Sequence, residues 1–326
     1  MGVQTWKSVP DHVFLAANPG GVVPSRKFGQ NHDVGTSVED ITPIGGLYAF
    51  PAAAETLGVV SDDANDVAVG TVATISLGDG GADYVQDEVI TIVQDGGVGA
   101  TVVATTVVGG AITVATLLTP GHGYSTGDNN VTIGGTGTGA LVDIDSLVGS
   151  LTGARTLRIE GLDANYDPLV EDVYLAGATE VVTTGLFLRV NRAYILTAGT
   201  SGTNEGTLTI DNTTSGNVVV QIDPLEGQTM QCIFTVPNGY KAVLGFIRGG
   251  VIASASDDGE FSLRVRPEGG AWNIKEQYAL GSGGSFNIGF NGADVFDGKT
   301  DIRMTAVSSQ ASIEVTGSFG FHLVPK

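Results

Sequence analysis

The sequence is poor in cysteine. Its 326 residues include one, Cys232, so no disulfide can form within the chain. The residues around Cys232 alternate between polar and apolar, which is typical of a strand and predicts a buried thiol. A single thiol also excludes zinc sites built from several cysteine thiolates.

Basic residues are scarce as well. Lys and Arg number 15 against 35 Asp and Glu, and the formal net charge is -20. A field of this sign repels phosphate backbones and no run of Lys or Arg overrides it, so nucleic acid is not an expected partner. The acidity is typical of a soluble surface. It also supports two hypotheses, binding of a structural divalent cation and adaptation to a saline medium.

Long apolar runs are missing. No segment approaches the length of a membrane span, and the first residues, MGVQTWKSVPDHVF, lack the apolar core of a signal peptide. Trp6 stands where a myristoylation signal requires Ser or Thr. We therefore expect synthesis in a cytoplasm and no membrane partner.

Signatures of catalysis are missing too. No GxSxG occurs, and residues 292–300 (GADVFDGKT) have one residue too many for a phosphate-binding loop and lead into strand-like sequence. Lys299 and Asp301 are predicted instead to form a surface ion pair. We expect no enzyme and no bound cofactor. The histidines are scattered without metal-ligand spacing, which predicts surface or interface positions for His12, His32, His122 and His322.

Glycine and short alternating segments are abundant. The 49 glycines and 42% apolar residues exclude disorder. From Leu47 onward, segments of alternating polarity are bounded by Gly, Asn and Asp roughly every ten residues, which is the pattern of a sandwich or barrel. The predicted fold is all-β: two antiparallel β-sandwich (jelly-roll-like) domains with an inserted small β-repeat module.

Changes in composition divide the chain into four parts. Residues 1–35 read as an extended N-terminal arm, because prolines and glycines interrupt any periodicity. We expect residues 36–69 plus 149–224 to form the first sandwich, 70–148 the inserted module, and 225–326 a C-terminal jelly-roll-like sandwich. The apolar residues of the arm suit contact with a neighbouring subunit or packing on its own domain, and they give Trp6, Val13, Phe14 and Leu15 as interface candidates.

The inserted part contains a repeat of forty residues. Tyr84 and Tyr124 begin the two copies, and Ala100 and Ala140 follow them at the same offset. Two such copies predict paired β-hairpin units that pack on each other. A Gly-rich acidic loop at residues 76–88, around the start of the first copy, is either a solvated turn or a calcium site. Its candidate metal ligands are Asp79, Asp83, Asp87 and Glu88.

Several stretches resemble virion structural proteins of tailed viruses from marine and saline waters. They are EDITPIGGLYAF and its continuation to residue 68, residues 156–210, and, near the C-terminus, IFTVPNGYKAVLGFI, LRVRPEGGAW and residues 298–324. Together these stretches make up about two-fifths of the chain. The text GHGYSTGDNNVTIGGTGTGA is similar to Gly-Tyr repeats inserted in many phage head and tail proteins.

The resemblance implies a part of a bacteriophage or archaeal virus particle, made in the host cytoplasm, with no catalytic residues. The first hypothesis is a capsid decoration or turret protein on the head exterior. Its partners would be the major capsid protein and further copies of the chain, most simply a homotrimer. The second is a tail or baseplate protein that binds a host surface glycan. Its candidate aromatic residues are Trp272, Tyr278, Tyr84 and Tyr124. The third is a polysaccharide-degrading enzyme with a carboxylate pair.

Overall fold

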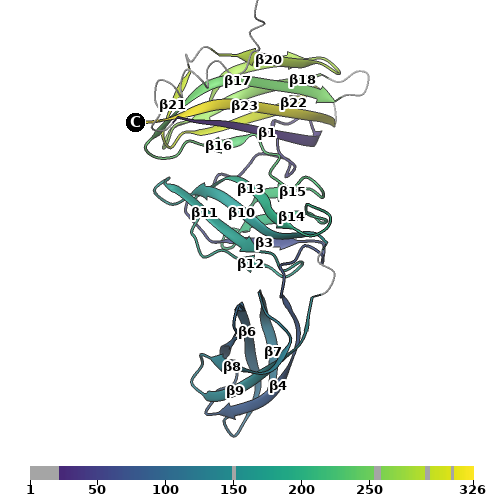
Figure 1. Cartoon of the computed structure of the whole chain (residues 1–326). Helices are drawn as coiled ribbons and strands as arrows, with labels where there is room; N and C mark the ends of the chain where they lie inside the picture. The colour runs from purple at the N-terminus through teal and green to yellow at the C-terminus, as the bar shows by residue number, and fades with distance from the viewer. Residues whose placement is uncertain (1–21, 149–151, 253–257, 291–293, 310–311) are drawn as a thin grey trace, which may run out of the picture.

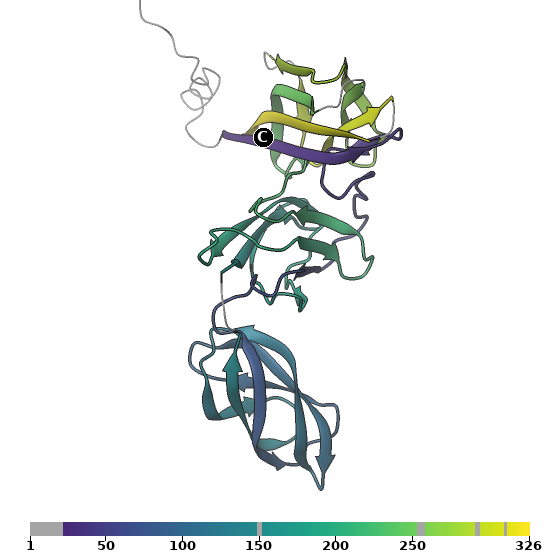
Figure 2. The ribbon, with the colours of Figure 1, turned by 90° about the vertical axis from the view of Figure 1, so that its right-hand side faces the viewer.

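The protein is all-β, as the sequence predicts. The computed structural model describes residues 22–148, 152–252, 258–290, 294–309 and 312–326, and its secondary structure consists of antiparallel strands. Within these residues no helix is long and apolar enough to cross a membrane. Three β units follow one another along the long axis of the molecule, each with its own hydrophobic core (Figures 1 and 2).

The first unit, here called the base, is a jelly roll built from residues 22–46 and 230–326. Its eight main strands form two sheets, ordered β1-β23-β17-β20 and β16-β22-β18-β19. Numbered along the chain, the orders are 1-8-3-6 and 2-7-4-5, which is the double Greek key of a jelly roll. Two short strands, β2 and β21, pair with β22 and β17. The strands are β1 (Val23–Val34), β2 (Glu39–Asp40), β16 (Ile233–Thr235), β17 (Tyr240–Ile252), β18 (Gly259–Arg266), β19 (Asn273–Leu280), β20 (Ser285–Gly289), β21 (Val295–Asp297), β22 (Asp301–Ser308) and β23 (Ile313–Pro325).

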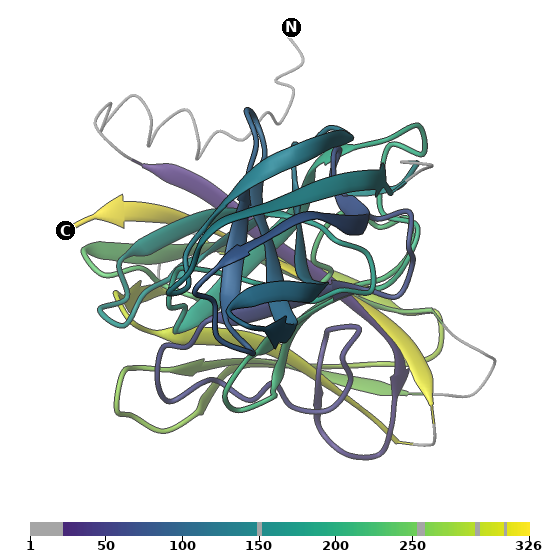
Figure 3. The same cartoon turned by 90° about the horizontal axis from the view of Figure 1, so that it is seen from below.

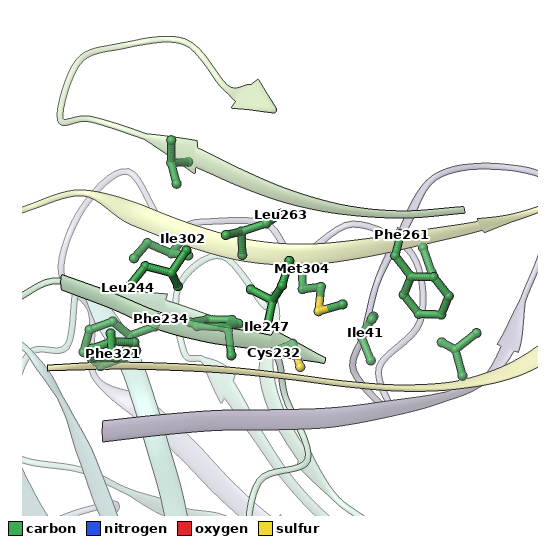
Figure 4. Close-up of a cluster of buried hydrophobic side chains, with 14 of the residues drawn as sticks. Ile41, Cys232, Phe234, Leu244, Ile247, Phe261, Leu263, Ile302, Met304 and Phe321 are labelled. Carbon is green, nitrogen blue, oxygen red and sulfur yellow. The ribbon is translucent and has the colours of Figure 1, made fainter. Parts of the chain in front are cut away.

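The core of the base lies between these two sheets. Alternate residues of β18 and β23, such as Phe261 and Phe319, are fully buried, because strand side chains point to opposite faces in turn. Cys232 and Met304 lie among them (Figure 4). Cys232 is a buried free thiol, which confirms its prediction, and burial raises its pKa.

The prediction of an arm over residues 1–35 is wrong for residues 22–35. β1 pairs with β23 in antiparallel register from Val23 to Asn31, shifts register before Val34, and forms an edge of the jelly roll. Its inward positions hold Lys27, Gly29 and Asn31, which are buried although none of them is apolar. The strand therefore lacks the alternation that marks a half-buried strand in sequence.

The boundary predicted at residue 36, between the arm and the first sandwich, is also wrong, because the residues on both sides of it belong to the base. β2 pairs with β22, and Ile41 lies in the core of the base. The chain thus begins the jelly roll, leaves it after its first strand and returns near residue 230. The interface candidates Trp6, Val13, Phe14 and Leu15 lie outside the described residues.

The excursion forms the second unit, the middle sandwich. Its two sheets are ordered β11-β10-β13 and β12-β3-β14-β15 and enclose a core that includes Leu57, Ile159 and Phe187. The strands are β3 (Leu57–Ser61), β10 (Ala154–Leu162), β11 (Pro168–Tyr174), β12 (Val181–Val182), β13 (Arg189–Ala198), β14 (Leu208–Asn212) and β15 (Val218–Ile222).

The third unit, the tip module, is one curled sheet of six strands between Val72 and Leu147, ordered β4-β9-β8-β5-β6-β7 (Figure 3). The edge strands β4 and β7 lie against each other so closely that a Cβ on Gly80 would collide with the Ile112 carbonyl. The strands are β4 (Val72–Ala82), β5 (Val89–Val93), β6 (Val98–Val108), β7 (Ala111–His122), β8 (Gly127–Ile133) and β9 (Thr138–Leu147).

The two copies of the predicted repeat pack on each other around the pairing of β5 with β8. Ile92 and Thr132, which occupy the same place in their copies, are direct register partners. Each tyrosine reaches into the other copy: the Tyr124 hydroxyl accepts the Ala100 amide at 3.0 Å, and the Tyr84 hydroxyl accepts the Ala140 amide at 3.4 Å. The prediction of paired hairpin units is confirmed.

Candidate functional site

Asp301 of β22 is the centre of the contact between the base and the middle sandwich. It is buried, and its carboxylate accepts hydrogen bonds at 2.9 and 3.3 Å from the guanidinium of Arg189, which comes from β13. Arg266 of β18 donates twice to one oxygen, and the Thr235 hydroxyl donates to the other at 2.6 Å. Forked arginine–carboxylate pairs fix direction as well as distance, so this joint holds the two units in one orientation.

Two aromatic rings cover this joint. Phe50, from the segment between β2 and β3, lies 5.2 Å from Trp272. The guanidinium carbon of Arg266 lies 4.9 Å from the Phe50 ring and 4.7 Å from the Trp272 ring, and that of Arg303 lies 4.0 Å from Trp272. The guanidiniums are attracted to the faces of the rings. The rings also exclude water from the joint, which strengthens the ion pairs of Asp301.

A second buried carboxylate lies beside this cluster. Asp40 accepts the Tyr48 amide at 2.7 Å and faces Arg303 at 3.4 Å. Burial raises the pKa of Asp40 to about 6, against the opposite effect of Arg303. Removal of a carboxylate from water favours its neutral form, and one oxygen of Asp40, Oδ1, has no hydrogen-bond partner among the described residues.

A cleft of about 450 Å³ separates the middle sandwich from the tip module. The ring of His122 from the tip module stacks on Tyr174 of β11 in the middle sandwich, with 3.6 Å between ring centroids. Burial lowers the pKa of His122. The carboxylate of Glu171 in this cleft accepts hydrogen bonds from Thr184 and Gly185. The cleft therefore combines an aromatic wall with a carboxylate that is already engaged.

The predicted calcium ligands serve the local turns. Glu88 accepts hydrogen bonds from the Thr136 hydroxyl and amide, which lower its pKa, and Asp79 accepts the Gly81 amide. Asp83 and Asp87 have left-handed backbone conformations, with φ of 63° and 68°. Among the described residues, no group of three or more His, Cys, Asp or Glu is placed to hold a metal ion. The structure does not gather these four residues into a site.

The predicted glycan-binding aromatics are also engaged in packing. Tyr84 and Tyr124 are buried in the core of the tip module. Trp272 covers the joint, and Tyr278 stacks on Phe286 and donates to Glu276 at 2.6 Å. The structure brings none of these four rings together on one exposed face.

The predicted ion pair between Lys299 and Asp301 is wrong. Lys299 faces Glu268 at 3.2 Å, and Asp301 belongs to the joint. The histidines differ from one another: His32 is exposed beside Glu314, His122 lines the cleft and His322 is buried, while His12 lies outside the described residues. The prediction of a surface or interface position is thus wrong for His322, which is buried within the chain.

Sequence reasoning missed the joint. Arg189 and Asp301 are separated by 112 residues, and no spacing between them marks a pair. One signal was available: Arg189, Arg266 and Asp301 are each the first or last residue of a strand, and a charge at a strand end needs a partner when that end is covered.

Charge is distributed unevenly along the molecule. The tip module has eight Asp or Glu and no Lys or Arg, whereas the base has ten Lys or Arg and twelve Asp or Glu. The far end is therefore strongly anionic, and the base is close to neutral. Like charges on neighbouring tips repel each other.

No protein-family model matches the chain, and no curated protein matches it. Among solved structures, a chain of the T13 IBDV viral particle is 10% identical to this one. That match covers 94% of this chain and 78% of the other, with a TM-score of 0.15. A TM-score of this size carries no argument about fold or function.

Proposed function

We propose that the chain is a structural, non-catalytic component of a tailed virus particle, a capsid decoration or turret protein on the head exterior. In this role the base contacts the shell, formed by the major capsid protein, and the tip module points away from it. The assembled form is a homo-oligomer, most simply a trimer at a local threefold axis.

The nested architecture carries this proposal. Jelly rolls recur in viral capsids, although the fold alone also serves lectins and enzymes. Here the jelly roll encloses the middle sandwich between its first and second strands, and that sandwich encloses the tip module between β3 and β10. Each projecting unit is therefore held to the unit below by two chain passes, an arrangement suited to a rigid projection.

Copy number tests the proposal. Quantitative mass spectrometry of purified particles should give hundreds of copies of this chain per particle, because a symmetric lattice repeats a decoration protein over the whole shell. A count of three to twelve copies would instead place it in the tail, and its absence from the particle would refute a structural role.

One observation favours the second function, a tail or baseplate glycan-binding protein. The cleft beside His122 and Tyr174 has an aromatic wall and the volume of a small-ligand site. Binding of the recombinant chain to host cells, with Tyr174→Ala as the variant, tests it. Cell binding that is lost in the variant supports glycan recognition, and no binding by either protein removes it.

A further inference from the structure

Cationic and aromatic side chains alternate on the outer face of the jelly-roll sheet β1-β23-β17-β20. Arg26 of β1 and Phe246 of β17 flank Gly320 of β23 from opposite sides, and Phe28 and Arg248 flank Ser318 in the same way. The central strand contributes only small residues at these two positions. Each arginine therefore lies opposite a phenylalanine across β23, and the two pairs have opposite orientations.

The small central residues allow this arrangement. A Cβ on Gly320 would collide with the Phe246 ring, so that ring lies across the central strand. A shallow hollow of about 640 Å³ follows the same face and is lined by Arg26, Phe28 and Arg248 together with polar groups such as Thr316 and Asn287.

A second hollow adjoins the first. It has a volume of about 430 Å³, shares Arg26 and Phe28 with the first, and continues onto the middle sandwich at Arg192. All three arginines are exposed, and each lies over a ring two residues away: 5.3 Å from Phe28, 4.5 Å from Phe246 and 4.2 Å from Tyr194. Stacking of this kind holds a guanidinium in place before a partner arrives.

Positive charge dominates the two hollows. Lys27 also lines the second one, is buried, and donates to the Asn191 carbonyl; burial lowers its pKa to about 8. Of the described residues that line the two hollows, Glu160 is the one carboxylate, against four cations. Among the described residues, no carboxylate forms an ion pair with Arg26, Arg192 or Arg248. A chain with a net charge of -20 therefore carries a cationic face at its base.

We propose that this Arg-aromatic face, defined by Arg26, Phe28, Arg192, Phe246 and Arg248, is a docking surface for an extended acidic polypeptide segment of a partner in the particle. The proposal rests on the proposed function and names the chemistry of the contact with the shell. Arg26 and Phe28 are separated by one strand repeat of roughly 7 Å, which matches the spacing of alternate side chains along an extended chain. Carboxylates of that segment meet the guanidiniums as forked pairs, and its apolar side chains meet the rings.

Decaglutamate labelled with fluorescein is the probe. Titrated with the full chain at low ionic strength and followed by fluorescence anisotropy, it should bind despite the like net charges. The triple variant Arg26→Ala, Arg192→Ala, Arg248→Ala should weaken binding at least tenfold. The matched control Lys241→Ala, Lys275→Ala, Lys299→Ala removes the same charge elsewhere on the base and should leave affinity unchanged. Equal weakening in both variants, or no binding to wild type, would overturn the proposal.

A measurement on the wild-type chain does not depend on how the variants fold. Decaglutamate should protect Arg26, Arg192 and Arg248 from modification by phenylglyoxal, read out residue by residue by mass spectrometry. Protection elsewhere would place the contact on another surface. If dextran sulfate binds with the same arginine dependence and decaglutamate does not, the partner is an anionic polysaccharide and the peptide proposal fails. Each result is independent of copy number per particle, so the two proposals fail separately.

Discussion

At the scale of single residues, Asp301 connects the base to the middle sandwich through its buried carboxylate. Two guanidiniums from different units share its buried carboxylate. Replacing all members of a buried ion pair with apolar residues often costs little stability. Removing one partner is strongly destabilising, because the other charge stays buried without a counter-charge. This carboxylate therefore helps to set the orientation of the base on the middle sandwich, together with contacts such as the Asn191 side chain with the Thr235 backbone.

Asp301→Asn should lower the free energy of unfolding by about 3–5 kcal/mol, because Arg189 and Arg266 lose their counter-charge. Urea unfolding followed by intrinsic fluorescence measures the loss. The matched control is Asp297→Asn, an exposed carboxylate beside Lys241 and Lys326, which should leave the midpoint unchanged. Similar unfolding midpoints for both variants would show that the ion pairs of Asp301 do not contribute to the stability of the chain.

Asp40 gives a pH dependence whose sign follows from burial. Its pKa in the folded chain, about 6, is higher than in the unfolded chain, so the folded chain holds the proton more tightly. The contribution of this bound proton to the free energy of unfolding is fully present below about pH 4 and is lost as pH rises through 6.

The difference in unfolding free energy between wild type and Asp40→Asn should therefore move in favour of the variant from pH 4 to 7. The change should be up to about 3 kcal/mol, and denaturant titrations at several pH values measure it. Parallel curves for the two proteins across this range would mean that Asp40 has an ordinary pKa.

At the scale of elements, the sequence predicted those strands whose buried positions are apolar. The alternation of apolar and polar residues in β10, β14 and β23 is visible in the amino-acid sequence, because one face of each strand meets a hydrophobic core. β1 was missed, since Lys27, Gly29 and Asn31 occupy its inward positions. The joint and the Arg-aromatic face were missed for another reason: they arise from pairings between distant strands, which a single sequence does not record.

The tip module depends on close contact between its two copies. Gly97→Ala should destabilise the module by about 1–3 kcal/mol, because the added Cβ collides with the Tyr124 ring. Gly127→Ala is the control, since its Cβ would meet nothing nearer than 3.5 Å. Hydrogen exchange measured by mass spectrometry should show faster exchange in β5 and β8 for Gly97→Ala only. Unchanged exchange there would contradict the packing described.

At the scale of the whole molecule, the nested insertions predict that units can be removed from the outside inward. The Val148 amide donates to the Thr71 carbonyl at 2.9 Å, so the two chain passes into the tip module already touch. Replacing residues 73–146 with a short Gly-Ser linker should leave the melting temperature of the remainder within a few degrees of wild type. Loss of cooperative unfolding would show that the module is part of the fold beneath it.

The central claim is that one rigid chain links a shell-bound base to an anionic tip. A cryo-electron microscopy map of the intact particle tests it most directly. We predict density for the jelly roll against the shell, with the Arg-aromatic face in contact and the tip module farthest out. A map that shows the tip module on the shell, or this chain only in the tail, would contradict that account.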